Sequence, residues 1–153
     1  MTPSDHYLST SVPGAHLVKL LQVPDLGRGD LCVADLAHAL PFVPRRCFWV
    51  SSPPPGSVRG DHAHRICSQF IFCASGSCLV ELDDGSRKAE LRLESPGAGL
   101  LVPPMVWVKI YQHAPGTVQM VFASHDYDSD DYIRDYEHFI HLHNESTNTP
   151  SQL

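Results

Sequence analysis

The residues best suited to chemistry lie in one short segment, Gly56-Ser-Val-Arg59-Gly60-Asp61-His62-Ala63-His64-Arg65. His62 and His64 are separated by one residue, so on a strand both side chains leave the same face, about 7 Å apart. Imidazole titrates near neutral pH and can therefore both remove and return a proton. Two surface histidines on a polar strand would show the same pattern. The residues around the pair favour a shared cavity, and the segment predicts a site of proton transfer.

Short extended segments must position this pair, because thirteen prolines and ten glycines divide the chain. Apolar and polar residues alternate most clearly over 89–94, and the turn 83–86 joins this segment to 78–82 as a hairpin. Further strands are expected at 16–23, 31–35, 47–51, 69–74, 100–102, 107–111 and 118–122. About nine or ten short strands at such regular spacing predict an all-β sandwich or barrel.

One segment near the C-terminus has a helical pattern instead. Aromatic residues recur at Tyr132, Tyr136 and Phe139, behind Ser129 as an N-cap and two acidic residues in the first turn. We expect one short helix over 129–140, lying against the sheet. Residues 1–13 and the polar tail 144–153 are expected to be flexible ends of a single domain that spans 14–143.

Composition argues against several classes of function. The chain has 153 residues, of which 42% are hydrophobic, and this suits one domain with one core. Eleven basic and seventeen acidic residues give a net charge of −6, so we expect no binding to bulk nucleic acid or to an anionic membrane. We expect neither a signal peptide nor a membrane span, because the apolar stretches are broken by Pro, Asp or His. Five cysteines without a C-x-x-C pair indicate reduced thiols in the cytoplasm.

The spacing around the histidine pair is similar to that of a known motif. The first motif of the cupin superfamily resembles the series Gly56, His62, His64, Gln69 and Gly76, whose members are separated by five, one, four and six residues. In cupins this motif lies in a jelly roll and supplies ligands to a metal. The resemblance therefore implies a jelly-roll fold with both histidines facing its interior.

Two differences from the cupin motif affect whether the site can bind a metal ion. The resemblance implies three histidines and a carboxylate as ligands, but here Gln69 stands where the glutamate is usual, and Val108 stands where the third histidine belongs. A neutral amide is a poor metal ligand, and valine is none. Asp61 and Asp126 are conceivable substitutes, but Asp61 adjoins His62 and should point to the opposite face of the strand. We expect a site without a metal.

A narrower resemblance runs over residues 16–140. Its carriers are Arg28-Gly29-Asp30-Leu31, Pro41-Phe42, Arg46-Cys47-Phe48, Val58-Arg59-Gly60-Asp61-His62-Ala63-His64-Arg65, Gln69, Gly76-Ser77-Cys78, Asp83-Asp84-Gly85, Pro103-Pro104-Met105-Val106-Trp107 and Asp131-Tyr132-Ile133-Arg134-Asp135-Tyr136. In this ordered series the chain resembles the WxcM-like sugar 3,4-ketoisomerases, which act on dTDP-4-keto-6-deoxy-D-glucose.

The resemblance implies a cytoplasmic homodimer with swapped N-terminal strands, which needs neither a metal nor another cofactor. Its H-x-H pair would move the keto group of a dTDP-linked 4-keto-6-deoxyhexose from C4 to C3, and later amination would lead to amino sugars of O-antigen or lipopolysaccharide. The residues suit this reaction, because removal of the C3 proton gives an enediol that is reprotonated at C4. One of His62 and His64 is expected to be the base at carbon, and the other to move protons between the oxygens; the sequence leaves open which.

Two further polar residues are candidates for substrate binding. Arg59 either forms a structural ion pair or, by resemblance, contacts the diphosphate or the sugar, where its fork suits phosphate oxygens. Gln69 either binds a substrate hydroxyl, orients His64 or is a satisfied buried amide.

Two tryptophans are candidates as well. Trp107 is either a core residue or, by resemblance, part of the sugar pocket. Trp49 stands where the family usually has a tyrosine near the substrate, and an indole N–H donates a hydrogen bond but accepts none. Together with Val108, this change puts the substrate, the stereochemistry or the activity of the chain in question.

Three alternative functions remain open. A dTDP-sugar 3,5-epimerase uses a related jelly roll, but by resemblance it works with a His–Asp dyad and a tyrosine. A nucleotide-sugar-binding cupin without turnover would keep the cavity and lose catalysis through the changes at Trp49 and Val108. A metal-dependent oxygenase is the least favoured, because only two of its four ligands are present.

Overall fold

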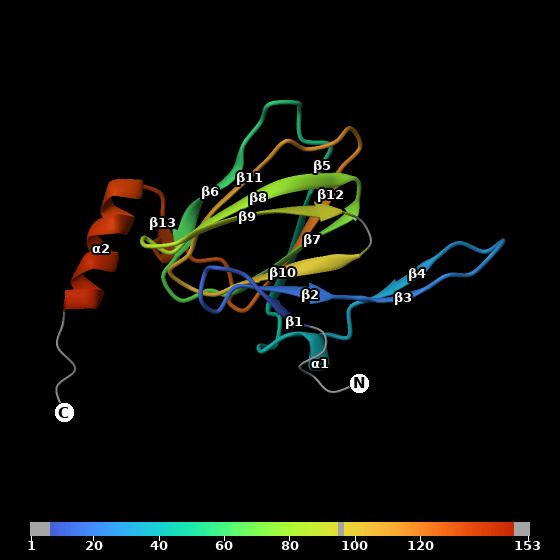
Figure 1. Ribbon diagram of the computed structural model, residues 1–153, viewed down its shortest axis with the longest axis horizontal. Helices are drawn as coiled ribbons and strands as arrows, with labels where there is room; N and C mark the ends of the chain where they lie inside the picture. Colours follow the sequence, from blue (N-terminus) through green and yellow to red (C-terminus); the bar gives the residue numbers. More distant parts are fainter. Residues whose placement is uncertain (1–6, 95–96, 149–153) are drawn as a thin grey trace.

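Two β-sheets face each other in the computed structural model, which describes residues 7–94 and 97–148 (Figure 1). The larger sheet consists, in spatial order, of β1 (Tyr7–Ser9), β2 (His16–Lys19), β10 (Ala98–Val102), β7 (Gln69–Ser75), β12 (Val118–Ala123) and β5 (Arg46–Ser51). The second sheet consists of β13 (Tyr132–Ile133), β6 (Arg59–His64), β11 (Trp107–Tyr111), β8 (Ser77–Asp83) and β9 (Lys88–Glu94). A separate hairpin of β3 (Leu21–Val23) and β4 (Leu31–Val33) extends away from the sandwich (Figure 1). The expected all-β jelly-roll fold is confirmed.

Alternating apolar residues hold the two sheets together. On β8 the side chains of Cys78, Val80 and Leu82 are fully buried, and they meet Ile71 of β7 and Leu100 of β10 across the interior. Burying a valine or leucine side chain of this kind contributes roughly 1.5–3 kcal/mol. The alternation of apolar and polar residues that predicted these strands therefore also directs their apolar side chains into the core.

The C-terminal helix begins later than the sequence predicts. Ser129–Asp131 is one 3-10 turn, the next two residues form β13, and helix α2 runs from Tyr136 to Asn148. Tyr132 and Ile133 pair with β6, and Ile133 is buried there, so pairing with the sheet outweighs the helical spacing of the aromatic residues.

The ends of the chain also differ from expectation. Residues 7–9 of the N-terminal segment expected to be flexible form β1, and residues 144–148 of the expected tail belong to α2. The remaining parts, 1–6 and 149–153, lie outside the described residues. A second short helix, α1 (Leu36–Ala39), was not expected. No helix among the described residues is long and apolar enough to cross a membrane.

Candidate active site

A cavity of about 210 Å³ lies between the two sheets and contains much of the predicted chemistry. We call it the histidine cavity; it is lined by Phe48, Val50, Arg59, Gly60, His62, Gln69, Ile71, Val108, Ile110, Gln119, Val121 and Tyr132. Three of the six predicted site residues, Arg59, His62 and Gln69, share this lining. Larger hollows of about 460 and 640 Å³ elsewhere contain neither histidine of the pair.

A β-bulge brings Arg59 to the cavity. Asp61 is an extra residue in β6, because His62 and Gly60 face consecutive residues of β11. Gly60 and Asp61 have φ angles of 71° and 58°, in the left-handed region. A Cβ atom on Gly60 would lie 2.8 Å from the carbonyl oxygen of Val108, so only glycine fits there. The extra residue lets Arg59, three positions before His62, line the same cavity, whereas a regular strand would turn it away.

Asp61 points away from the histidine cavity, as the sequence predicted. Its carboxylate accepts a hydrogen bond from the indole Nε1–H of Trp107 at 3.2 Å and lies 3.7 Å from the ammonium of Lys109. It is therefore not a substitute metal ligand beside His62. Asp126 also contributes no ligand there, since it pairs with Arg45 at 3.3 Å.

His62 is held as a neutral ring at the cavity wall. Its Nδ1–H donates to the carbonyl oxygen of Gly60 at 2.9 Å, which leaves the lone pair of the ring on Nε2. Burial, the neighbouring His64 and the charge of Arg134 lower its pKa to about 4, against the opposing effects of the Gly60 carbonyl and Asp61. Near neutral pH this ring can accept a proton or pass one on, but it carries no charge.

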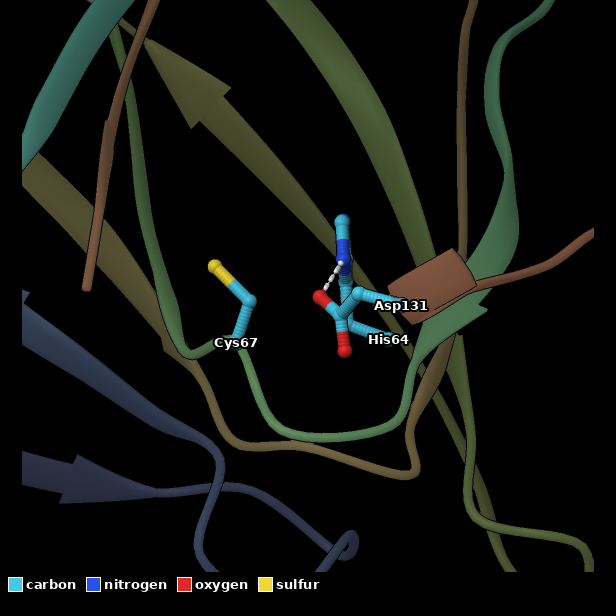
Figure 2. Close-up of side chains that lie close together, drawn as sticks. All are labelled: His64, Cys67 and Asp131. Carbon is cyan, nitrogen blue, oxygen red and sulfur yellow. Dashed lines mark hydrogen bonds and ion pairs between the residues drawn. The ribbon is translucent and has the colours of Figure 1, made fainter. Parts of the chain in front are cut away.

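His64 is buried behind His62 and has hydrogen bonds on both nitrogens. Its Nδ1–H donates to Oδ2 of Asp131 at 2.7 Å (Figure 2). Its Nε2 accepts from the Gln69 amide at 3.1 Å. Burial lowers the pKa of His64, while the hydrogen bond and the charge of Asp131 oppose this shift. Gln69 therefore orients His64, one of the roles that the sequence left open, and it also lines the cavity.

The carboxylate of Asp131 is itself fixed by the backbone. Its Oδ1 accepts from the N–H of Ile66 at 2.7 Å. Burial raises its pKa, but the hydrogen bonds from Ile66 and His64 outweigh burial and keep the pKa of Asp131 below its usual value. Asp131 is thus ionised near neutral pH and favours the tautomer of His64 with the proton on Nδ1.

Tyr132 completes the aromatic wall around the pair. Its ring centroid lies 4.9 Å from that of His62 and 4.3 Å from that of His64, and the two histidine rings are 5.0 Å apart. The guanidinium of Arg134 lies 4.3 Å from the centroid of the Tyr132 ring. The spacing of Tyr132 with Tyr136 predicts a helix face, whereas pairing of β13 with β6 places Tyr132 in the cavity.

Cys67 lies near His64 and Asp131, and the three side chains offer metal-ligating atoms within 4.8 Å of one another. In Figure 2, however, the carboxylate and the imidazole point toward each other, while the thiol stands apart. An ion would have to replace the hydrogen bond between His64 and Asp131 and compete with the N–H of Ile66 for the carboxylate. The donor set therefore fits the positioning of an imidazole better than the binding of a metal.

Neither predicted tryptophan lies in the histidine cavity. Trp49 is 62% exposed, because β5 alternates and directs Phe48 and Val50 inward on either side of it. Trp107 is buried instead against α2, with its ring 5.5 Å from that of Phe139. On this strand Phe48, and not Trp49, lines the histidine cavity, and Trp107 is packed in the core, the alternative position for it.

Four residues near the site were missed or misplaced by sequence reasoning. Asp131 was expected to serve a helix dipole and Tyr132 a helix face, and Gln119 was not singled out. His113, which was not singled out either, is only 8% exposed. The alternation of β12, in which Gln119 shares a face with the buried Val121, was the available signal for Gln119. No local pattern indicated that Asp131 would reach His64, since the contact spans 67 residues.

The sandwich and its interior histidine pair define a cupin-type protein, and comparison with known proteins agrees. The sequence profile of the family described as "WxcM-like, C-terminal" (FdtA) matches residues 13–144, and the chain belongs to this family. The chain is 39% identical over 112 residues to the TDP-4-oxo-6-deoxy-alpha-D-glucose-3,4-oxoisomerase of Aneurinibacillus thermoaerophilus, covering 73% of this chain and 81% of the relative.

Solved structures extend the similarity to the fold. QdtA of Thermoanaerobacterium thermosaccharolyticum, a sugar 3,4-ketoisomerase in complex with TDP, has a TM-score of 0.83 and 27% identity over 88% of this chain and 98% of that chain. A 3,4-ketoisomerase from Helicobacter canadensis has a TM-score of 0.80 and 28% identity, with 86% and 98% covered. The RmlC epimerase of Mycobacterium tuberculosis shares the fold alone. It is 18% identical, with a TM-score of 0.71 over 82% of this chain and 70% of that chain.

Proposed function

We propose that the protein is a sugar 3,4-ketoisomerase that moves the keto group of a TDP-linked 4-keto-6-deoxyhexose from C4 to C3 in deoxysugar biosynthesis. Its family membership supports this reaction. Structures of QdtA in complex with TDP and, as a His-to-Asn mutant, with TDP-4-keto-6-deoxyglucose support the substrate class. The observation that carries the proposal is the pair of interior imidazoles 5.0 Å apart, one of which is bound to the carboxylate of Asp131.

In the proposed mechanism His64 is the base at carbon: its ring is not part of the cavity lining, but its Nε2 is directed at Gln69, which is. Asp131 accepts its Nδ1–H and stabilises the imidazolium that forms when Nε2 takes up the C3 proton. Gln69, the present partner of Nε2, gives up its hydrogen bond when the substrate enters. The resulting enediol is reprotonated at C4 by the same imidazolium, whose Nε2 proton exchanges with solvent while the enediol is bound, so the number of protons is unchanged overall.

His62 moves the second proton in this scheme. The hydroxyl at C3 must lose its proton to become the ketone, and the oxygen at C4 must gain one. His62, with Nδ1–H fixed on Gly60 and a lone pair on Nε2, accepts the proton from the first oxygen and returns it to the second. Its low pKa favours release of that proton to the C4 oxygen, which returns His62 to the neutral form.

We propose that neither step uses a metal or another cofactor. Support comes from Asp131, whose two oxygens are engaged by His64 and by the N–H of Ile66, and from Gln69 and Val108, which are poor or absent ligands beside His62. We propose that Arg59 binds the diphosphate of the substrate, supported by its exposed position in the lining of the histidine cavity.

We also propose that the protein acts as a homodimer with exchanged N-terminal strands. Support comes from the projecting β3–β4 hairpin, on which Leu21, Leu26 and Leu31 are 59%, 103% and 56% exposed (Figure 1). β1 lies at the edge of the larger sheet and pairs with β2 of its own chain. Light scattering coupled to size-exclusion chromatography tests the dimer, and a Leu21→Asp, Leu31→Asp variant should shift it toward monomer. The five free cysteines favour the cytoplasm as its location.

Proton NMR of TDP-4-keto-6-deoxyglucose with chelator-treated protein in D₂O tests the reaction. A 3-keto isomer with deuterium at C4 is the expected product. Deuterium at C3 and C5 without migration of the keto group would instead indicate a 3,5-epimerase, the fold of which is shared. Binding of the nucleotide sugar without exchange would indicate a binding protein. Loss of turnover on chelation, restored by a divalent metal, would contradict the metal-free mechanism.

A further inference from the structure

Two buried polar side chains near the histidine cavity have no role in the mechanism above. Gln119 of β12 lines the cavity and is 3% exposed, and His113, in the loop after β11, is 8% exposed. Oε1 of Gln119 and both ring nitrogens of His113 have no hydrogen-bond partner among the described residues. The two side chains interact, which by itself raises the pKa of His113, but their contact falls short of hydrogen-bond geometry.

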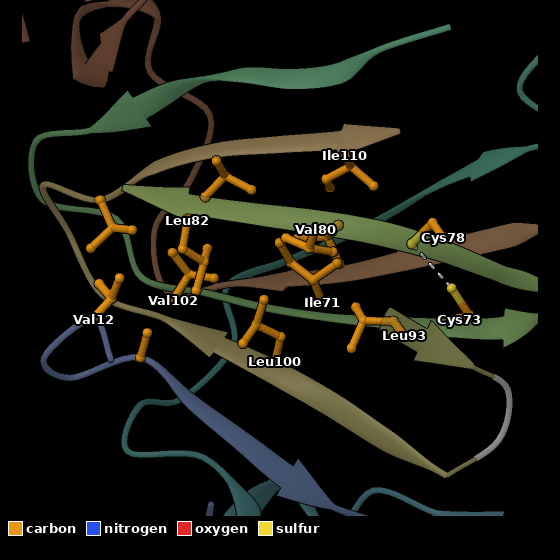
Figure 3. Close-up of a cluster of buried hydrophobic side chains, with 14 residues drawn as sticks. Val12, Ile71, Cys73, Cys78, Val80, Leu82, Leu93, Leu100, Val102 and Ile110 are labelled. Atoms are coloured by element: carbon orange, nitrogen blue, oxygen red, sulfur yellow. Dashed lines mark hydrogen bonds between the residues drawn. The ribbon is translucent and has the colours of Figure 1, made fainter. Parts of the chain in front are cut away.

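Packing does not explain an amide at position 119. The neighbouring inward positions are apolar, with Val121 on the same strand, Ile71 on the adjacent strand β7 and Ile110 on the facing sheet. Figure 3 shows the side chains of Ile71 and Ile110 within the apolar cluster between the sheets. A buried polar group without a partner destabilises a fold, and buried polar groups in proteins are normally paired. Such a group on a cavity wall therefore points to a ligand.

The charges around the two residues indicate the kind of ligand. Burial lowers the pKa of His113, and the guanidinium of Arg59 lowers it further, so the ring is neutral near neutral pH. A neutral amide and a neutral imidazole offer donors and acceptors but no positive charge. They suit a hydroxyl group better than a phosphate, for which Arg59 is the better partner.

We propose that Gln119 is a specificity-determining residue whose amide hydrogen-bonds a hydroxyl group of the sugar in the histidine cavity, with His113 as the neutral side chain beside the amide. This inference rests on the proposed function and names a contact made to the sugar and not to the nucleotide. A site built to hydrogen-bond a hydroxyl discriminates strongly, because an analogue without the hydroxyl leaves the amide unpaired.

Gln119→Met tests this contact, since methionine is unbranched and of similar length but cannot hydrogen-bond as an amide does. KM for TDP-4-keto-6-deoxyglucose should rise about tenfold, which corresponds to the loss of one hydrogen bond. The Kd of TDP, which lacks the sugar, should stay within twofold. The thermal midpoint should stay equal or rise, because an unpaired buried amide is removed. Gln112→Met, the same change at an exposed position, is the matched control.

Gln119→Leu provides a second variant and should behave in the same way. A KM in both variants equal to that of Gln112→Met would overturn the inference, as would an equal loss of TDP affinity or a lower thermal midpoint with unchanged KM. Failure of the proposed function is distinguishable, because it would appear in the wild-type chain as binding of TDP without binding or turnover of the nucleotide sugar. That result would remove the inference as well.

Discussion

Nδ1 of His64 lies 2.7 Å from Oδ2 of Asp131, and both side chains are 6% exposed. The other oxygen of the same carboxylate accepts from the backbone N–H of Ile66 at 2.7 Å. One buried carboxylate thus fixes both the tautomer of an imidazole and the backbone just beyond the end of β6. Because the Asp131 carboxylate uses one oxygen for each of these contacts, replacing either oxygen should disturb the site.

Asp131→Asn should lower kcat by about 10² to 10⁴-fold, because an amide has one acceptor oxygen and cannot serve both His64 and Ile66. The fold should be retained, with a lower thermal midpoint from the lost hydrogen bond. Steady-state kinetics and circular dichroism melting measure the two effects. Asp130→Asn, at the exposed neighbouring position, should leave kcat unchanged. Full activity in Asp131→Asn would contradict a role for the carboxylate.

The two histidines should fail in different ways. His64→Asn should lose both isomerisation and exchange of the C3 proton with D₂O, since it removes the proposed base at carbon. His62→Asn should lose isomerisation by about 10² to 10⁴-fold yet keep measurable C3 exchange. NMR of the substrate in D₂O measures both properties in one sample. If C3 exchange were lost in His62→Asn and kept in His64→Asn, His62 would be the base at carbon and His64 would move protons between the oxygens.

Stability should fall on acidification before the carboxylates are protonated. The pKa of His62 is about 4 in the folded protein and near 6.5 when unfolded, so between these values the unfolded chain binds a proton that the folded chain does not. The contribution of His62 to the free energy of unfolding is therefore complete above pH 6.5. It is lost as the pH falls toward 4. Urea unfolding at pH 7, 6 and 5 measures this slope, which should be shallower in His62→Asn. An equally steep slope in the variant would show that other groups cause it.

Gly60→Ala should destabilise the protein more than Gly56→Ala does. Both glycines have positive φ, at which a Cβ costs about 1–2 kcal/mol. At Gly60 the Cβ also meets the carbonyl oxygen of Val108, whereas at Gly56 it meets nothing within 4 Å. Denaturant unfolding gives the difference in free energy of unfolding. Equal effects would mean that β6 shifts to relieve the close contact.

The outward position of Trp49 can be tested against its inward neighbour. Phe48→Ala should raise KM for the nucleotide sugar several-fold, because Phe48 lines the histidine cavity. Trp49→Ala should leave kcat and KM within about twofold, since this side chain is 62% exposed on the other face of β5. A large loss of kcat in Trp49→Ala, with the oligomeric state unchanged, would place the indole near the substrate.

Much of the fold could be predicted from the sequence, because residues such as Val80 and Leu82 alternate at the period that buries one face of a strand. The histidine pair was predicted for the same reason. The spacing of residues along the chain predicted the wrong element where pairing between distant strands determined the structure. Tyr132 has helical spacing with Tyr136 but lies in a strand beside His64. Asp131 could not be connected with His64 by any local rule. Trp49 was aligned with the tyrosine that the family usually has near the substrate. On β5, however, a shift of one residue in that alignment exchanges a position in the cavity for an exposed one.

The extra residue in β6 makes the composition of the histidine cavity depend on the length of this strand. Asp61 contributes no side chain to the histidine cavity, and its carboxylate is engaged with Trp107 on the other side of the strand. Removing it would nevertheless rotate Arg59 away from His62, although every residue of the cavity lining would still be present in the chain. The site therefore depends on a residue count as well as on residue identity. Point substitutions at position 61 would report on its φ of 58° and its bond to Trp107, whereas only a single-residue deletion would reveal its effect on Arg59.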